Sequence, residues 1–120
     1  IIQSKGKLVL GEQFGINSFS RIVAHESITI GRNVTIGQMV SILDHDHDFS
    51  NKDQLVQQQG YISKEIFIGD DVWIASNVFI GKGVKISNGA IIASGSVVVD
   101  DVEENTVVGG VPAKFIKNRF

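Results

Sequence analysis

The segment ISKEIFIGDDVWIASNVFIGKGVKISNGAIIASGSVV, residues 62–98, carries an apolar residue at every sixth position. The repeated residues are Ile62, Ile68, Ile74, Ile80, Ile86, Ile92 and Val98. The next residue is usually Gly, Ala or Ser, and the residue three positions on is usually Asn, Asp or Gly. Because Gly, Asn and Asp tolerate a positive φ, their recurrence indicates one tight corner in each repeat.

A period of six fits neither an α-helix, with its 3.6 residues per turn, nor a simple hairpin meander. It is typical of short strands joined by corners, with three sides closing a triangular coil of about 18 residues. The inward residues of successive coils then stack, which predicts Ile62 under Ile80 under Val98, and Ile68 under Ile86. The sequence therefore predicts an all-β, parallel β-helix built from hexapeptide repeats.

The same period extends upstream, and it is interrupted once. Ile30, Ile36 and Ile42 keep the spacing, and Leu10, Ile16, Ile22 and Ile28 keep it with a two-residue slip before Ile30. Residues 44–61 are polar and break the pattern, which predicts a loop extruded from one corner. The repeat fades into a C-terminal tail, residues 104–120, with the single proline at Pro112. We expect one domain over residues 1–120, with this loop and this tail attached.

Composition excludes several classes of protein. Of 120 residues, 32 are Ile or Val and only 9 are Leu or Ala, which disfavours a helix bundle. The net charge of −2 gives no basic surface for nucleic acid, and no apolar run is long enough to predict a membrane span. Cysteine is absent, so thiolate zinc sites and cysteinyl intermediates are excluded. With no signal peptide at its start, we expect the chain in the cytoplasm.

The densest group of titratable residues is Asp44-His45-Asp46-His47-Asp48, at the start of the predicted loop. Histidine is the natural general base near neutral pH, and a neighbouring carboxylate fixes its tautomer. A solvated acidic loop and a zinc site are the two alternatives for the same residues.

Residues outside this group are open to similar pairs of interpretations. His25 fits a surface or corner position. Trp73 directly precedes the inward residue Ile74, so its side chain is predicted to point outward. An outward tryptophan is more often part of a contact surface than of the core. Lys114 and Lys117 follow a Gly-Gly-x-Pro bend and are either ordinary surface charges or phosphate ligands.

Two longer stretches, residues 11–49 and 68–117, resemble the hexapeptide-repeat acyltransferases, and among them the maltose, galactoside and nodulation O-acetyltransferases. The most specific matches are GDDVWI, residues 69–74, and the GVPAK stretch ending at Lys114. The resemblance implies a left-handed helix, acetyl-CoA as co-substrate, no metal, and a homotrimer with active sites between subunits.

The resemblance also assigns roles to individual residues. His47 matches the catalytic histidine, with His45 taking that role if the register is shifted by two. The matches to the coenzyme site are Trp73, Ala75, Ser76, Ser94, Lys114 and Lys117. Acceptor binding falls to Asn17, His25 and His45, although galactoside-type enzymes carry aspartate where this chain has His25.

The function implied is transfer of an acetyl group from acetyl-CoA to a sugar hydroxyl. With no cysteine and no Gly-x-Ser-x-Gly motif, direct transfer is favoured over a covalent acyl-enzyme. Three alternatives remain open: N-acetylation of an amino sugar, a carbonic anhydrase-type metal enzyme using His25, His45 and His47, and a solenoid with no catalytic role.

Overall fold

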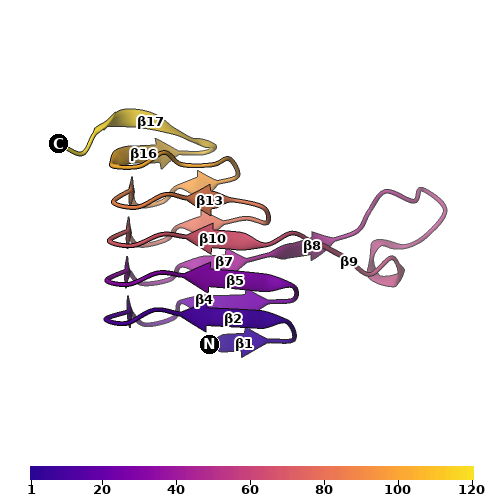
Figure 1. Cartoon of the computed structure of the whole chain (residues 1–120). Helices are drawn as coiled ribbons and strands as arrows, with labels where there is room; N and C mark the ends of the chain where they lie inside the picture. The colour runs from indigo at the N-terminus through magenta and orange to yellow at the C-terminus, as the bar shows by residue number, and fades with distance from the viewer.

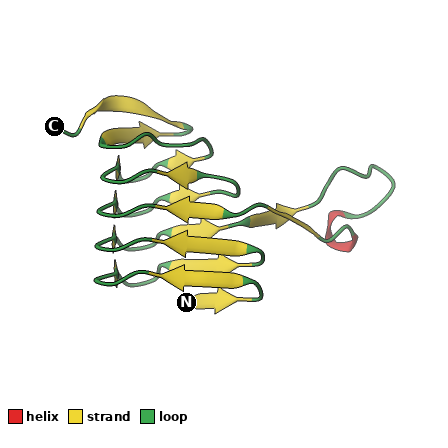
Figure 2. Ribbon diagram, in the orientation of Figure 1, coloured by secondary structure: helices red, strands yellow, loops and turns green.

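The computed structural model describes residues 1–120 as a stack of parallel coils with one long excursion on its side (Figure 1). Each coil crosses three sheets that enclose a triangular core, and strands one coil apart pair in parallel. Apart from a three-residue 3₁₀ turn, all regular structure is strand (Figure 2). The prediction of an all-β hexapeptide-repeat solenoid is confirmed, and no helix is present that could cross a membrane.

Three sheets form the sides of the prism. The first sheet contains β1 (Ile2–Ser4), β4 (Arg21–Ala24), β7 (Ser41–Leu43), β12 (Phe79–Ile80) and β15 (Val97–Val98). The second contains β2 (Lys7–Leu10), β5 (Ser27–Ile30), β10 (Ile66–Ile68) and β13 (Lys85–Ile86). The third contains β3 (Gly15–Ile16), β6 (Thr35–Ile36), β11 (Trp73–Ile74), β14 (Ile91–Ile92), β16 (Thr106–Gly110) and β17 (Ala113–Asn118).

The winding is left-handed, as the resemblance implied. In Figure 1 the near strands β2, β5, β10 and β13 run to the left, while the far strands β4 and β7 run to the right as the chain rises from the N-terminus. Most corners use the residues expected from the sequence, although Gln13, Phe19 and Met39 also adopt a positive φ in the lower coils. Asn33, Asp71 and Asn77 have φ between 54° and 60°, and Gly83, Gly89 and Gly95 occupy the same positions in the upper coils.

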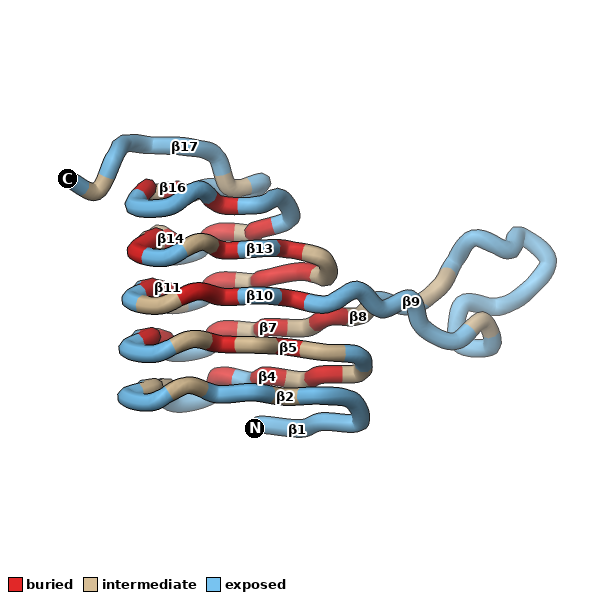
Figure 3. The backbone as a smooth tube through the Cα atoms, viewed as in Figure 1, coloured by how far each residue is buried: buried red, intermediate tan, exposed pale blue.

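The interior is a set of stacked isoleucine columns. Figure 3 shows the buried segments of the backbone recurring from one coil to the next. Ile68 pairs with Ile86 as predicted. Ile80 lies between Val98 above and Ile42 below. The predicted position of Ile62 in this column is wrong, because Ile62 is 46% exposed and belongs to the excursion instead. Its six-residue spacing from Ile68 does not reflect a coil side, since the chain rejoins the second sheet only at Ile66, where β10 begins.

Coil length differs along the prism. Ile22 pairs with Ile42, a coil of 20 residues, whereas Ile80 pairs with Val98, a coil of 18. The longer coils carry extra residues at the corner between the first and second sheets, where His25 and Glu26 separate β4 from β5. We call this edge of the prism the arm corner. The two-residue slip in the sequence repeat is the signature of these longer coils.

The excursion leaves and rejoins the prism at the arm corner. Its base is an antiparallel pair, β8 (His45–His47) and β9 (Tyr61–Ser63), and its tip contains the 3₁₀ turn η1 (Val56–Gln58). Lys64 N–H donates to the Asp44 carbonyl at 2.8 Å, so the two ends meet where they join the prism. We call residues 45–63 the arm.

The C-terminal tail forms a hairpin over the last coil. β16 continues the third sheet, and β17 returns antiparallel to it after a cis Val111–Pro112 peptide. Ala113 packs against the core, whereas Phe115 and Ile116 are exposed. The tail therefore extends the third sheet by two strands.

Candidate active site

Asp44 is the centre of the arm corner. Its carboxylate is fully buried and accepts the backbone N–H groups of the corner one coil below. His25 N–H donates to Oδ1, and the Glu26 and Ser27 N–H groups both donate to Oδ2, each at 2.8 Å. Burial alone raises the pKa of Asp44, but these hydrogen bonds and one from His45 outweigh it and hold the pKa below its ordinary value.

The His45 ring makes the fourth contact of this carboxylate. His45 Nδ1 lies 3.0 Å from Asp44 Oδ1. Because an ionised carboxylate only accepts hydrogen bonds, the proton of the neutral ring lies on Nδ1. Nε2 is then left with a free lone pair. The arrangement is that of a histidine base oriented by a buried carboxylate.

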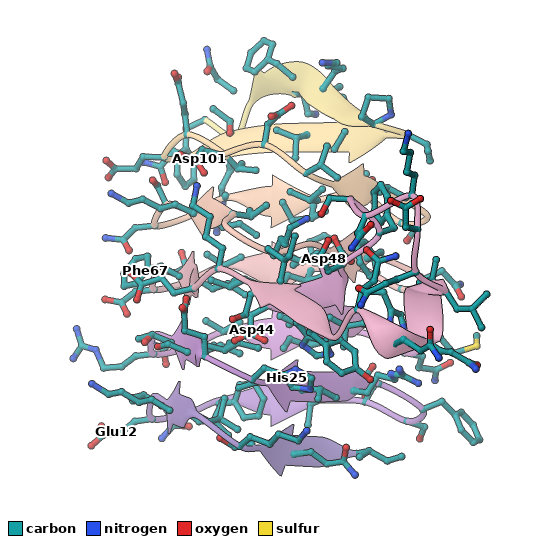
Figure 4. The ribbon with its side chains drawn as sticks, turned by 90° about the vertical axis from the view of Figure 1, so that its right-hand side faces the viewer. Glu12, His25, Asp44, Asp48, Phe67 and Asp101 are labelled. Atoms are coloured by element: carbon teal, nitrogen blue, oxygen red, sulfur yellow. The ribbon has the colours of Figure 1, made fainter.

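His25 and His45 stack face to face. Their ring centroids are 3.4 Å apart and their planes differ by 4°. Tyr61 of β9 meets both rings edge-on, with centroid distances of 5.0 Å to His25 and 5.8 Å to His45. Seen from the side of the arm, His25 lies below Asp44 at this corner (Figure 4). Burial, the His45 ring and Lys5 lower the pKa of His25, while Asp44 opposes that shift.

His47 lies further out along the arm and is exposed. Its ring is 4.7 Å from that of Tyr61, and no hydrogen bond orients it. With Leu55, Val56 and Gln57 it lines a shallow depression between the arm's base and its tip. Between the two histidines, Asp46 accepts a hydrogen bond from Lys82 Nζ at 2.6 Å, which ties β8 to the corner after β12.

A second group of predicted residues lies at the corner between the third and first sheets. Ser76 and Ser94 occupy equivalent positions on successive coils, and Ala75 precedes Ser76 at the end of β11. Asn17 belongs to the first coil of the same corner, where its N–H donates to the Ile36 carbonyl at 3.0 Å. We call this edge, residues 17–20, 37–40, 75–78 and 93–96, the serine corner.

Trp73 and Lys117 share one outward column of the third sheet. Trp73 pairs with Ile91, Ile91 with Val107, and Val107 with Lys117. Trp73 is 51% exposed, as its phase in the repeat predicts. Lys114 differs from Lys117, because it lines a shallow pocket at the C-terminal end of the prism whose rim includes Asp100, Asp101 and Glu103.

The predicted site residues thus form two groups within one chain. His25, His45 and His47 gather at the arm corner, whereas Trp73, Ala75, Ser76, Ser94 and Lys117 follow the third sheet and the serine corner. In a triangular prism the corner between two sheets is opposite the third sheet, as Figure 1 shows for the arm. One chain therefore does not bring the two groups together.

Sequence reasoning gave no individual role to Asp44 or Tyr61, two residues that shape the arm corner. It includes both in the polar loop, residues 44–61. A signal for Asp44 exists in the coil length, since Asp44 follows Ala24 by one 20-residue coil and so lies above the His25 corner. Tyr61 has no comparable signal, because its place depends on the pairing of β9 with β8.

Comparison with known proteins places this fold in a class. A family model described as bacterial transferase hexapeptide (six repeats) matches residues 65–100. The structure of a hexapeptide-repeat acetyltransferase from Vibrio cholerae O1 biovar eltor, complexed with acetyl coenzyme A, is similar with a TM-score of 0.88 and 32% identity, over 99% of this chain and 65% of that one. No curated protein matches the sequence.

Two further acetyltransferase structures are also similar to this chain. Another structure of the hexapeptide-repeat acetyltransferase from Vibrio cholerae is 30% identical, with a TM-score of 0.77, over 93% of this chain and 74% of that one. A maltose O-acetyltransferase from Clostridium difficile 630 is 28% identical, with a TM-score of 0.82, over 98% of this chain and 65% of that one. The chain thus spans about two thirds of the length of these relatives. It belongs to the hexapeptide-repeat acetyltransferases, as the sequence motifs predicted.

Proposed function

We propose that the protein transfers an acetyl group from acetyl-CoA to a hydroxyl group of a sugar. The observation that carries the proposal is the pairing of a histidine with a buried carboxylate at the arm corner, His45 Nδ1 on Asp44 Oδ1 at 3.0 Å. The family supports the acetyl donor, since the Vibrio cholerae relative is complexed with acetyl coenzyme A. The maltose O-acetyltransferase from Clostridium difficile supports a sugar hydroxyl as acceptor.

The chemistry is a direct transfer in a ternary complex. His45 Nε2 takes the proton of the acceptor hydroxyl as its oxygen attacks the thioester carbonyl. The tetrahedral oxyanion is stabilised by hydrogen-bond donors on the coenzyme side, with the Ser76 hydroxyl and backbone N–H groups as candidates. The carbon–sulfur bond then breaks, and the imidazolium returns the proton to the departing thiolate. Acetyl ester and free coenzyme A leave, and the histidine ends neutral.

The geometry favours His45 over His47 as the base. His45 has a carboxylate that fixes its tautomer, a stacked neighbour that fixes its ring plane, and little exposed surface. His47 is exposed and lacks a hydrogen-bond partner. The resemblance assigned the role to His47, with His45 as the alternative two residues away. His47 is better suited to the acceptor side, where the depression beside Leu55 and Val56 lies.

The coenzyme is proposed to lie along the third sheet and the serine corner. Trp73 supplies a flat exposed surface, while Ser76 and Ser94 supply hydroxyl groups on successive coils beside Ala75. Lys117 stands at the end of the Trp73 column and suits a phosphate group. Lys114 suits it less, because the carboxylates of its pocket repel an anion.

The separation of the two groups supports a homotrimer with sites between subunits. The arm corner of one protomer would meet the third sheet and serine corner of the next, and three such contacts close a ring. Asn17, at the serine corner, would then face the acceptor from the subunit that binds the coenzyme. A supply of acetyl-CoA fits a cytoplasmic location.

A metal-dependent function is less well supported by the geometry. The lone pairs of imidazole nitrogens lie in the ring planes, and the planes of His25 and His45 are parallel at 3.4 Å. Lone pairs in parallel planes do not converge on one tetrahedral ion. Within the chain no three His, Asp or Glu side chains are grouped as ligands.

The test is release of free thiol from acetyl-CoA in the presence of a panel of sugars, nucleotide-sugars and amino sugars. We expect activity with a sugar hydroxyl acceptor and a loss of about 10²–10⁴-fold in kcat for His45→Ala. His47→Ala, the matched substitution on the same strand, loses less. If His47→Ala is the more damaged variant, the base assignment is reversed. If no acceptor in the panel supports thiol release, or only amino sugars do, O-acetylation of sugars is refuted.

A further inference from the structure

His25 is held by the same carboxylate oxygen that holds His45. Asp44 Oδ1 accepts the His25 backbone N–H at 2.8 Å and lies 3.0 Å from His45 Nδ1. Asp44 Oδ1 therefore has two effects. It holds the backbone at the corner that carries His25, and it fixes the tautomer of His45. The near-parallel stack follows from this shared anchor, because both rings leave the prism from equivalent positions on successive coils.

The His25 and His45 rings have both negative and positive groups near them. Asp44 is the buried carboxylate in contact with the pair, and Glu26 is the neighbour of His25 along the chain. Lys5, at the corner of the coil below, is a positive neighbour of His25. Tyr61 closes the side of the stack and separates it from His47.

One buried carboxylate compensates one imidazolium, not two. When His45 takes a proton it gains charge directly against Asp44 Oδ1, whereas a second proton on His25 would place two cations at a ring distance of 3.4 Å. Interacting groups of this kind take up protons in two separate steps. Burial, the His45 ring and Lys5 lower the pKa of His25. His25 is thus kept neutral beside the imidazolium that forms on His45 during transfer.

We propose that His25 is a positioning residue for the base: a flat, uncharged platform that holds the His45 ring parallel to itself and against Asp44, and that supports the imidazolium formed on His45 during transfer. Its role in catalysis rests on the proposed function. The platform differs from the acceptor-binding role that the resemblance assigned to His25. A neutral aromatic face also attracts a cation, which is the charge His45 acquires when it removes the proton.

The stack itself is tested without substrate, by NMR titration of the histidine rings. Wild-type protein should show a His25 midpoint below that of a free histidine. In His45→Phe the midpoint of His25 should rise, because the like charge is gone. In His25→Phe the step assigned to His25 should vanish, which confirms the assignment. His47→Phe, the same change at the histidine outside the stack, should leave the His25 midpoint at its wild-type value. An unchanged His25 midpoint in His45→Phe refutes the coupling whether or not the protein is an enzyme.

The catalytic role is tested by comparing two substitutions at position 25. His25→Phe keeps a flat face and His25→Ala removes it, so kcat should fall about tenfold or more further in the alanine variant. The KM for acetyl-CoA should stay unchanged in both. If both variants instead raise the acceptor KM alike, with equal kcat, His25 contacts the acceptor and the platform role is overturned. Absence of transfer activity in wild type would refute the proposed function while leaving the titration result intact.

Discussion

Trp73 and Lys117 lie in one outward column of the third sheet, joined through the paired residues Ile91 and Val107. The column exists because β16 and β17 continue the sheet beyond the last complete coil. It places an exposed aromatic ring and an ammonium group on the same face, separated by two apolar residues. That pattern suits a long ligand with a ring-contacting part and an anionic end.

Replacing Lys117 with alanine is expected to raise the KM for acetyl-CoA by roughly tenfold or less, with little change in kcat. The reason is that a phosphate contact remote from the thioester acts equally on the ground state and the transition state, and an exposed charge contributes modestly. Steady-state kinetics with varied acetyl-CoA measures the effect. Lys114→Ala is the matched control and should change KM less. An equal rise in both variants would contradict the distinction drawn from the acidic pocket around Lys114.

Mixed assemblies of two inactive variants are expected to regain activity. If each site joins the arm corner of one subunit to the Trp73 column of the next, His45→Ala and Trp73→Ala subunits damage opposite sides of it. Random co-assembly of equal amounts then restores about one quarter of the sites. Co-expression with two affinity tags, followed by the thiol-release assay, measures this. Recovery near zero, or a monomer in sedimentation velocity at micromolar concentration, would show that sites are not shared.

Asp44→Ala is expected to lower the free energy of unfolding by about 3 kcal/mol. The substitution leaves the N–H groups of His25, Glu26 and Ser27 without their acceptor at a partly buried corner. Urea denaturation at fixed protein concentration gives the value. Asp46→Ala removes only a surface ion pair with Lys82 and should cost less than about 1 kcal/mol. Equal losses in the two variants would mean that the corner does not depend on this carboxylate.

The pH dependence of stability is expected to report His25. Its folded-state pKa is lowered from 6.5, so below that pH the unfolded chain binds more protons than the folded one. This contribution is fully present above pH 6.5 and declines as the pH falls below it. Asp44, with a lowered carboxyl pKa, loses its contribution only below about pH 3.8. Unfolding free energies should therefore fall between pH 7.5 and about 5.5 in wild type and change less in His25→Phe.

Two isoleucines with the same phase in the sequence are expected to differ sharply. Ile80→Ala should cost about 3–5 kcal/mol, because its side chain is fully buried between Ile42 and Val98. Ile62→Ala should cost less than about 1 kcal/mol, because Ile62 is exposed on the arm. Denaturant titration of both variants gives the comparison. A large loss in Ile62→Ala would indicate that the arm supports the prism.

The prism was predictable from sequence because its signal is repeated at every coil. Buried isoleucines lie on successive sides of the prism, with corner residues between them: Ile68, Ile74, Ile80, Ile86 and Ile92. Ile62 was misplaced because it stands six positions before Ile68 and yet lies on β9 of the arm, where it is exposed. A local pattern does not distinguish an apolar residue of the arm from one inside a coil.

The site was predictable in its residue types and less so in its geometry. Asp44, Asp46 and Asp48 look alike in DHDHD, yet Asp44 is buried and Asp46 is half-exposed. The difference lies in the coil below, whose N–H groups point at position 44 and at no other. The stacking of His25 on His45 depends on the 20-residue coil that separates them, which the pairing of β4 with β7 shows and the two-residue slip in the repeat signals only indirectly.

The arm replaces one corner of one coil and nothing else. Its two ends meet through the hydrogen bond from Lys64 N–H to the Asp44 carbonyl, and the coils below and above pair across it without a gap in register. An insertion at this corner therefore leaves the strand pairing of the prism unchanged. Sequence change in residues 45–63 can therefore alter what the molecule recognises while the columns of isoleucine keep their spacing, so the scaffold and its specificity can evolve separately.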